Sequence, residues 1–236
     1  AEHLLAKLKL PTAAGGKRSE ALSDSRARRL APELLPALEC LVTDYRASHL
    51  LDLQCGSGEL LVSLAKKRKG LVAVGIAPDD EAAYRANGNF AAAGLEKRLI
   101  AVPASPTEVL LDTPRTFERM GISKALWAEI DFVYLPLLFS EGPRDLDGVS
   151  QILAATRKHF SAATIVVAEP TEGSRLSKNY YAAEFLLLLR LTRAGPWTVE
   201  QWREAFAAAK LPLSAEVGLN VDGVTLFISR PAGRSR

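Results

Sequence analysis

Along the first half of the chain, short apolar runs alternate with helical patterns, and this alternation constrains the fold more than any other feature of the sequence. Apolar runs at residues 50–53, 71–76 and 99–102 have the length of buried strands, and helical patterns at 59–69 and 79–93 separate them. A strand–helix–strand–helix–strand order is typical of a parallel sheet whose strands are joined by crossover helices. The sequence therefore predicts an α/β domain.

The two helical patterns carry boundary signals that support this prediction. Residues 66–69 are all Lys or Arg, and Gly70 follows them, as expected where cations and glycine complement the exposed carbonyls of a last helical turn. Asp79 or Asp80 is placed to cap the next helix, which we expect to end before Gly94.

The second half of the chain continues the pattern. We expect strands at 130–137 and 164–168 with a helix at 146–160 between them, and a further helix at about 116–127. A second helix near the end of the chain should begin at Thr198, because Thr198 and Gln201 have the spacing of a capping box.

The chain closes with two β-rich runs, residues 215–221 and 224–229, joined by Asp222-Gly223. Asp-Gly between such runs favours a tight antiparallel hairpin. The expected fold is a doubly wound, Rossmann-like sheet, mostly parallel, with an antiparallel C-terminal hairpin. Its first strand should lie at the centre.

We divide the chain into an N-terminal helical arm or lid over residues 1–46 and an α/β domain over residues 47–236. A stripe of leucines in the arm has to be covered by the sheet domain or by another subunit, so we expect Leu34, Leu38 and Leu41 to be buried. The polar stretch 11–29 is expected to act as a hinge or to be mobile.

Net charge, cysteine content and the length of the most apolar stretch indicate what kind of protein this is. Thirty Lys and Arg against 27 Asp and Glu give a net charge of +3, too small to favour nucleic acid as a partner. Cys40 and Cys55 are expected to be free thiols in a reducing compartment. The most apolar stretch, residues 185–189, is far shorter than the roughly 18–20 residues that span a bilayer. We expect a soluble, cytoplasmic protein with no membrane partner and no metal site.

The segment LLDLQCGSG, residues 50–58, carries the clearest functional signal. A strand ends near Leu53, glycines follow at Gly56 and Gly58, and a helix begins at Glu59. Glycines let a ligand approach the backbone, and ligands of open α/β sheets bind outside the carboxyl ends of the strands. The sequence has no Walker loop and lacks the third glycine of a dinucleotide fingerprint. The pattern therefore indicates a single nucleoside-like ligand.

At these residues the chain resembles the class I S-adenosylmethionine-dependent methyltransferases, over about residues 48–230. LLDLQCGSGELL is similar to the first motif of that family. Residues 70–102 resemble its second strand, helix and third strand, and residues 198–231 resemble the closing helix and hairpin of its small-molecule members. The resemblance implies S-adenosylmethionine as cofactor and methyl transfer to oxygen or nitrogen of a small or medium organic molecule.

The resemblance also implies which positions contact the cofactor. Residues around the glycine turn would surround its methionine and ribose, those after the second strand its ribose and adenine, and those after the third strand its adenine edge. In chain order these positions are Asp52, Gln54, Gly56, Ser57, Gly58, Ala77, Pro78, Asp79, Ala104 and Ser105. The side chain of Gln54 either faces the pocket or packs under the following helix.

Two positions depart from the family pattern. Ala77 stands where the family usually has an acid that binds the ribose hydroxyls, and Ala104 lies where an Asp usually contacts adenine. Two lost hydrogen bonds would weaken cofactor binding by about tenfold to a hundredfold. Asp79 is placed to reach back toward the ribose and compensate.

Candidates for acid–base chemistry are few. The chain has three histidines, and none is placed as a base: His3 lies in the arm, His49 at the entrance of the first strand, and His159 at the end of a helix. Glu141 is the better candidate for a base, because it follows the fourth strand where some methyltransferases have His. Tyr134 lies near the end of that strand and is the second catalytic candidate.

Two other functions remain open at this stage. The alanines at 77 and 104 are also consistent with a methyltransferase-like domain of reduced activity that serves as a binding scaffold or as part of a larger synthase. The basic stretch at 17–29 is consistent with an RNA methyltransferase, which is less favoured. The apolar run 185–189 suits an acceptor pocket, a contact with the arm or a homodimer contact.

Overall fold

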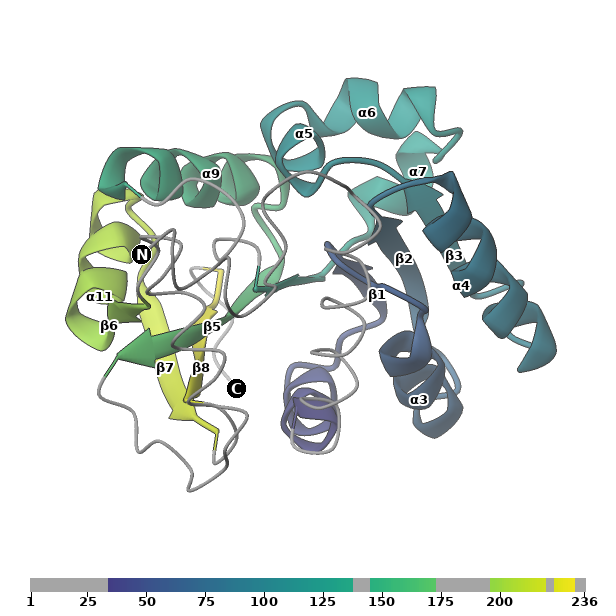
Figure 1. The fold of residues 1–236 in the computed structure, drawn as a ribbon, viewed down its shortest axis with the longest axis horizontal. Helices are drawn as coiled ribbons and strands as arrows, with labels where there is room; N and C mark the ends of the chain where they lie inside the picture. The colour runs from purple at the N-terminus through teal and green to yellow at the C-terminus, as the bar shows by residue number, and fades with distance from the viewer. Residues whose placement is uncertain (1–33, 138–144, 173–195, 220–222, 232–236) are drawn as a thin grey trace, which may run out of the picture.

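The computed structural model describes residues 34–137, 145–172, 196–219 and 223–231. Within this part of the chain, one sheet has the strand order β3-β2-β1-β4-β5-β8-β7, and β6 pairs with the end of β5 (Figure 1). The strands are β1 His49–Asp52, β2 Val72–Ala77, β3 Leu99–Pro103, β4 Phe132–Pro136, β5 Thr164–Glu172, β6 Trp197–Thr198, β7 Leu213–Gly218 and β8 Val224–Ser229.

The direction of the strands agrees with the expected fold. Strands β1 to β5 are parallel, and β8 runs antiparallel to both β5 and β7. The mostly parallel sheet with an antiparallel C-terminal hairpin is thus confirmed, and β1 lies between β2 and β4 at its centre. Asp222 of the predicted turn lies outside the described residues.

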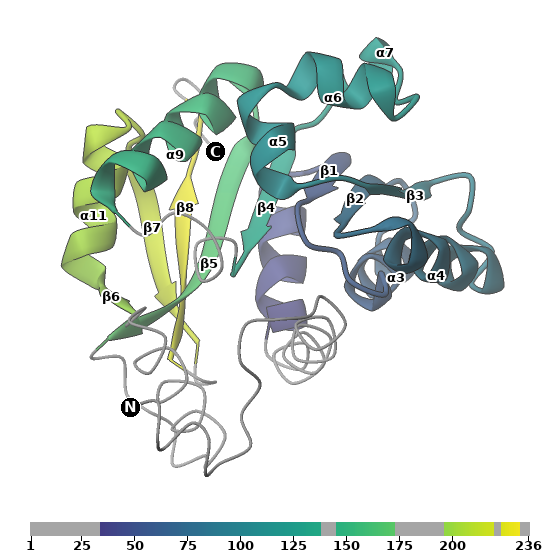
Figure 2. The same ribbon diagram turned by 45° about the horizontal axis from the view of Figure 1, so that its top comes forward.

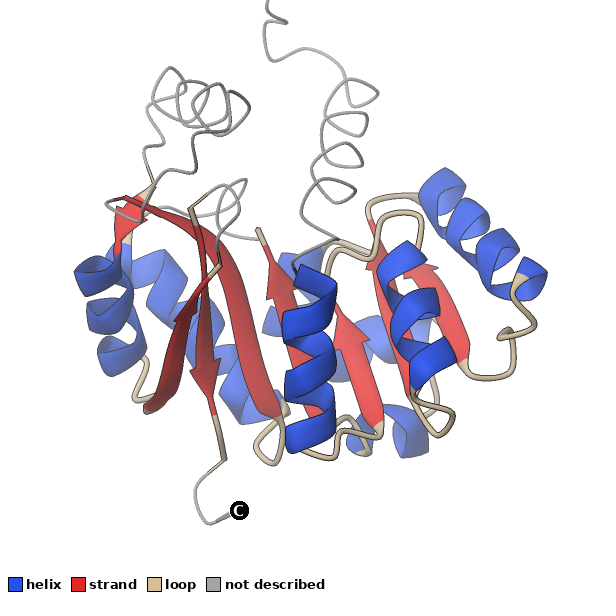
Figure 3. Cartoon of the chain, turned by 90° about the horizontal axis from the view of Figure 1, so that it is seen from below, coloured by secondary structure: helices blue, strands red, loops and turns tan. Residues whose placement is uncertain are grey.

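Helices cover both faces of the sheet (Figure 3). On one face, the helix over residues 34–44 packs with α3 and α4, and on the other face α5, α6, α9 and α11 cover the sheet. The helices named here and the short α7 are α3 Glu59–Lys67, α4 Asp80–Ala92, α5 Pro106–Leu111, α6 Thr113–Arg119, α7 Lys124–Ala128, α9 Leu146–His159 and α11 Val199–Ala208.

Two helix starts follow the side-chain chemistry expected from the sequence. The Asp79 carboxylate accepts a hydrogen bond from Ala82 N–H at 2.8 Å and caps α4. Thr198 and Gln201 form the capping box of α11, with both reciprocal hydrogen bonds present.

The prediction of one helix at 116–127 is wrong. Two short helices, α6 and α7, overlap that range, and a third, α5, precedes them (Figure 2). Pro106 and Pro114 stand at the starts of α5 and α6, a position that proline favours, and Gly121 adopts φ 72° between α6 and α7. These residues divide the segment.

The leucine stripe of the first described helix is shifted by one residue from the prediction. Leu34 and Leu38 are buried as expected, but Leu41 is only half-buried and Val42 is buried instead. Positions 34, 38 and 42 form one line along a helix, which places Leu41 at its edge. The arm before residue 34, including the predicted hinge at 11–29, lies outside the described residues. Within the described residues, no helix is long and apolar enough to cross a membrane.

Candidate functional site

The candidate site lies where the order of strands reverses. β1 is flanked by β2 on one side and β4 on the other, and Asp52 pairs in register with Gly75 of β2 and Tyr134 of β4. The chain leaves β1 for one neighbour and returns later to the other, and in open α/β sheets ligands bind outside the carboxyl ends of the strands at such a point. The residues after β1 are therefore placed to meet a ligand.

The glycine turn after β1 needs its glycines. Gly56 and Gly58 have φ of 52° and 76°, and Gly58 is the N-cap of α3. A methyl group at Gly58 would overlap the Phe90 ring of α4. The turn thus combines a left-handed backbone with close packing, which only glycine permits without strain.

Hydrogen bonds hold this turn against its neighbours. Cys55 N–H donates to Ile76 O of β2 at 3.0 Å, and Gly58 N–H donates to Cys55 O at 2.8 Å. Asn89 of α4 donates through its side-chain amide to Ser57 O at 2.9 Å. The turn is therefore fixed by β2 and α4 and not left to move as an open loop.

Asp52 is the most unusual residue of the site. Its side chain is 1% exposed, and Oδ1 accepts a hydrogen bond from Gln54 N–H at 3.0 Å. Its other oxygen, Oδ2, has no hydrogen-bond partner within the described part of the chain. Burial disfavours the charged form and raises the pKa of Asp52 from 3.8 to about 7, against the smaller opposing effect of the Gln54 hydrogen bond.

Tyr134 lies beside Asp52 and is likewise buried. Its side chain is 1% exposed, and its hydroxyl has no hydrogen-bond partner among the described residues. Burial, and then the nearby carboxyl groups of Asp52 and Glu169, raise the pKa of Tyr134 well above its usual value. The phenol is therefore a neutral hydrogen-bond donor, which makes it a poor general base.

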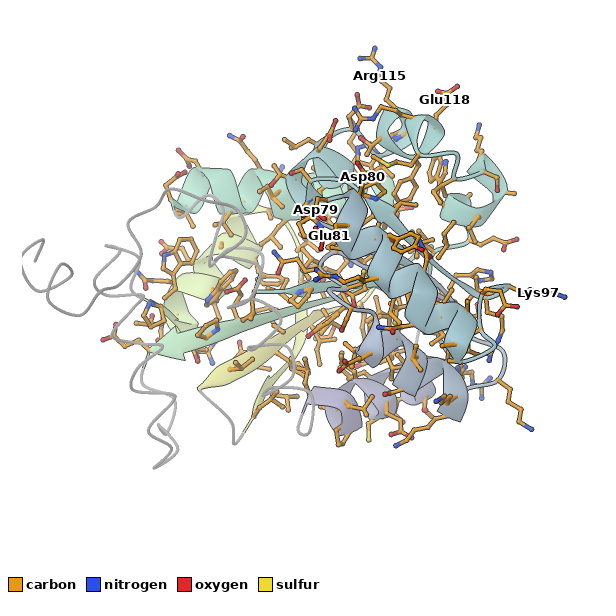
Figure 4. The ribbon with its side chains drawn as sticks, turned by 45° about the vertical axis from the view of Figure 1, so that its right-hand side comes forward. Asp79, Asp80, Glu81, Lys97, Arg115 and Glu118 are labelled. Atoms are coloured by element: carbon orange, nitrogen blue, oxygen red, sulfur yellow. The ribbon has the colours of Figure 1, made fainter. Side chains whose placement is uncertain are left out.

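The residues after β2 differ in accessibility. Ala77, the last residue of the strand, is buried, whereas Pro78 is exposed and Asp79 half-buried. Asp79 lies with Asp80 and Glu81 at the amino end of α4 (Figure 4). Because Oδ1 of Asp79 caps α4, the expectation that this carboxylate turns back to a ribose competes with an existing hydrogen bond.

The residues after β3 close the same edge of the sheet. Ala104 is buried, and its N–H donates to Ala77 O at 3.0 Å, which joins the ends of β3 and β2. Ser105 is exposed at the N-cap position of α5, where its side chain makes no capping hydrogen bond. The structure therefore brings the two alanines together at one edge.

Of the remaining candidates, two lie in the glycine turn and the others lie away from it or outside the described residues. Gln54 and Ser57 are half-buried in the turn. His49 lies at the amino end of β1, where Nε2 is 3.0 Å from Glu129 Oε2, and His159 ends α9. Glu141, His3 and the run 185–189 lie outside the described residues, as does the basic stretch 17–29. The described chain contains no cluster of three or more His, Cys, Asp or Glu that could hold a metal ion.

The pairing of Asp52 with Tyr134 and the packing of Phe90 against the turn were not found from the sequence. The register between β1 and β4 depends on the tertiary fold, because the two strands are far apart in the chain. A partial signal for this pairing was present in the sequence, since both side chains were expected near the carboxyl ends of their strands.

Comparison with known proteins supports the fold. No protein-family model matches the chain, and no curated protein is significantly similar in sequence. Among solved structures, RosA from Streptomyces davawensis, an N,N-8-amino-8-demethyl-D-riboflavin dimethyltransferase, has a TM-score of 0.65 at 15% identity, covering 93% of this chain and 60% of its own. An O-methyltransferase family protein from Burkholderia thailandensis has 0.66 at 18%, covering 94% and 62%.

A third similar structure shows what such a fold can bind. The O-methyltransferase NcsB1 from neocarzinostatin biosynthesis, in complex with S-adenosylhomocysteine and 1,4-dihydroxy-2-naphthoic acid, has a TM-score of 0.65 at 17% identity, covering 90% of this chain and 58% of its own. The chain spans about three fifths of the length of these structures. At such identities the likeness shows the fold alone, which is that of the class I S-adenosylmethionine-dependent methyltransferases.

Proposed function

We propose that this chain binds S-adenosylmethionine at the β1–β4 edge and transfers its methyl group to a small or medium organic molecule. The observation that carries the proposal is Asp52, a buried carboxyl group directly before the glycine turn, one of whose oxygens has no hydrogen-bond partner among the described residues. A buried polar group without a partner is costly, and a cationic ligand would relieve that cost.

The residues present fit this cofactor in part. Asp52 would accept from the ammonium group of the methionine portion, and Gly56 and Gly58 would let the ligand approach the backbone. Gln54 and Ser57, half-buried in the same turn, would line the ligand. Ala77 would leave the ribose hydroxyls without a carboxylate partner, so we expect modest affinity.

When bound, S-adenosylmethionine supplies a methyl group on a sulfonium sulfur. The protein then has to align the methyl donor with the acceptor atom and exclude water, and proximity of this kind can lower a barrier by about 7–11 kcal/mol. A strong base is optional under such a mechanism, which suits a chain whose His49 and His159 lie away from the site. If the acceptor needs a base, Glu141 is the candidate. RosA and NcsB1 act on or bind small organic molecules, which supports an acceptor of that class.

Calorimetry of the full chain with S-adenosylmethionine and S-adenosylhomocysteine tests the proposal. We expect binding of both, weakened about tenfold or more by Asp52→Asn, because a hydrogen bond to a charged group contributes about 1.5–3 kcal/mol. Asp44→Asn removes an exposed carboxylate from the helix over residues 34–44 and serves as the matched control. Wild-type protein that binds neither compound below about millimolar concentration would overturn the proposal.

A second candidate function is supported by Ala77 and Ala104, which meet at the edge where the fold family usually has acids. We infer from them that a binding or scaffold domain of reduced activity, or a domain of a larger synthase, is the alternative. The variant Ala77→Asp tests whether the alanine at this position limits cofactor binding, as the alternative assumes. A gain in cofactor affinity would indicate that the pocket has lost a contact that it once had. Unchanged affinity would indicate that the present pocket binds by another route.

A further inference from the structure

Two buried polar atoms at the β1–β4 edge have no partner within the described chain, and they are of opposite kinds. Asp52 Oδ2 can accept a hydrogen bond, and the Tyr134 hydroxyl can donate one. Both side chains are 1% exposed. A buried donor and a buried acceptor left unsatisfied together indicate a position that a third group completes.

The register of the sheet places these two residues side by side. Asp52 and Tyr134 are direct partners on adjacent parallel strands, so their side chains leave the same face of the sheet from backbones about 4.7–4.9 Å apart. They do not satisfy each other, because neither unpartnered atom has a hydrogen bond to the other. A ligand group that reached both would have to present a donor and an acceptor close together.

We propose that Tyr134 donates its hydroxyl hydrogen bond to a carboxylate of the bound ligand while Asp52 accepts from the ligand's ammonium group. The two strands would then recognise an α-amino-acid end, the chemical group that carries both charges on one carbon. The inference rests on the proposed function, because the methionine portion of S-adenosylmethionine is such an end. It assigns Tyr134 a binding and specificity role in place of the catalytic role expected from the sequence.

The electrostatics of the pair agree with these roles. Tyr134 stays neutral because burial and two neighbouring carboxyl groups raise its pKa, so it keeps the proton that it donates. Burial raises the pKa of Asp52 to about 7, and an ammonium group next to this carboxyl group would favour its ionised form. A lone cation would satisfy Asp52 and leave the Tyr134 hydroxyl unpaired, and a lone anion would do the reverse and be repelled by Asp52.

Three nucleosides separate the two contacts by calorimetry on the full chain. S-adenosylhomocysteine carries both charged groups, its decarboxylated amine keeps only the ammonium, and methylthioadenosine carries neither. We expect Tyr134→Phe to weaken S-adenosylhomocysteine about tenfold and to leave the other two unchanged. We expect Asp52→Asn to weaken S-adenosylhomocysteine and its amine, and to leave methylthioadenosine unchanged.

The free protein provides a second readout. Because the Tyr134 hydroxyl has no partner among the described residues, Tyr134→Phe should keep or raise the Tm of the free protein, whereas a structural hydroxyl would lower it. Tyr84→Phe, at a side chain that is 81% exposed on α4, is the matched control and should change neither Tm nor affinity.

Each outcome decides between the proposals. Equal losses for all three nucleosides with Tyr134→Phe, or no loss for any, would overturn the role of Tyr134 while the proposed function stands. Wild-type protein that binds none of the nucleosides would overturn the proposed function and this inference with it.

Discussion

Burial of Asp52 sets fold stability against ligand binding at a single residue. Water stabilises a carboxylate, and the described residues around Asp52 supply one hydrogen bond in its place. A rise in pKa from 3.8 to about 7 corresponds to an upper bound on the order of 4 kcal/mol of destabilisation once the group is ionised. Since Asp52 Oδ2 has no partner among the described residues, a ligand that supplied one would lower this penalty.

The pH dependence of folding tests the raised pKa of Asp52. Because the pKa of Asp52 is raised in the folded state, its neutral form costs little at acidic pH, and the penalty grows as pH rises from about 4 to about 7. Asn mimics the neutral acid, so Asp52→Asn should match the wild type at pH 5 more closely than at pH 8, where the variant should be more stable. Urea unfolding of both proteins at each pH measures the difference. An equal difference at the two pH values would contradict the pKa assignment.

Binding should show the opposite dependence on pH. A cationic ligand prefers ionised Asp52, so the affinity for S-adenosylmethionine should rise as pH increases through about 7 and then level off. The same titration with Asp52→Asn should be flat over this range, apart from changes in the ligand itself. Calorimetry at several pH values measures both curves, and parallel curves would show that another group controls binding.

Part of this candidate site could be predicted from the sequence for a physical reason. Asp52, Gly56 and Gly58 lie in one local segment, and local segments carry their own strand, turn and helix signals. The pairing of Asp52 with Tyr134 depends on which strands become neighbours, which no local pattern contains. The same limit hid the contact between Gly58 and Phe90.

Among the secondary-structure elements, the turn between β1 and α3 offers a test of how backbone conformation and packing combine. Gly58→Ala would place a Cβ in a left-handed conformation, at a cost of about 1–2 kcal/mol, and also against the Phe90 ring. Gly94 has a similar φ of 69° with open space around an added methyl group, so Gly94→Ala should lose only the stability that the left-handed backbone costs. Urea unfolding should show a larger loss of stability for Gly58→Ala. Equal losses would mean that Phe90 moves aside without cost.

The elements predicted best were those whose boundary signals are local. The cap of α4 and the capping box of α11 follow from two residues each, and both are present. The segment before β4 was predicted poorly because it consists of three short helices. Pro106 and Pro114 mark the starts of two of them, and Gly121 separates the last two. β6 was not predicted, since two residues carry no periodicity and exist as a strand only through pairing with β5.

In the whole molecule, the helix over residues 34–44 belongs to the core on one face of the sheet. Leu34, Leu38 and Val42 are buried in the same cluster as residues of α3, α4 and the sheet. Arg68 also donates to Ala47 O at 2.8 Å, which ties the end of α3 to the chain after this helix. Contacts of this kind make the described helix a support of the sheet, so its removal should affect folding before it affects binding.

Leu38→Ala tests this arrangement. Leu38 is 1% exposed, so the substitution should lower the free energy of unfolding by about 2–5 kcal/mol through lost burial and a cavity. Leu111→Ala, at a side chain that is 55% exposed, should change the free energy of unfolding by no more than about 0.5 kcal/mol.

Truncation before Ala47 should cause aggregation, because it exposes the apolar face of α3 and the sheet. If the truncated chain instead stays monomeric and folded, and only its ligand affinity falls, the segment acts as a lid over the site and not as part of the core.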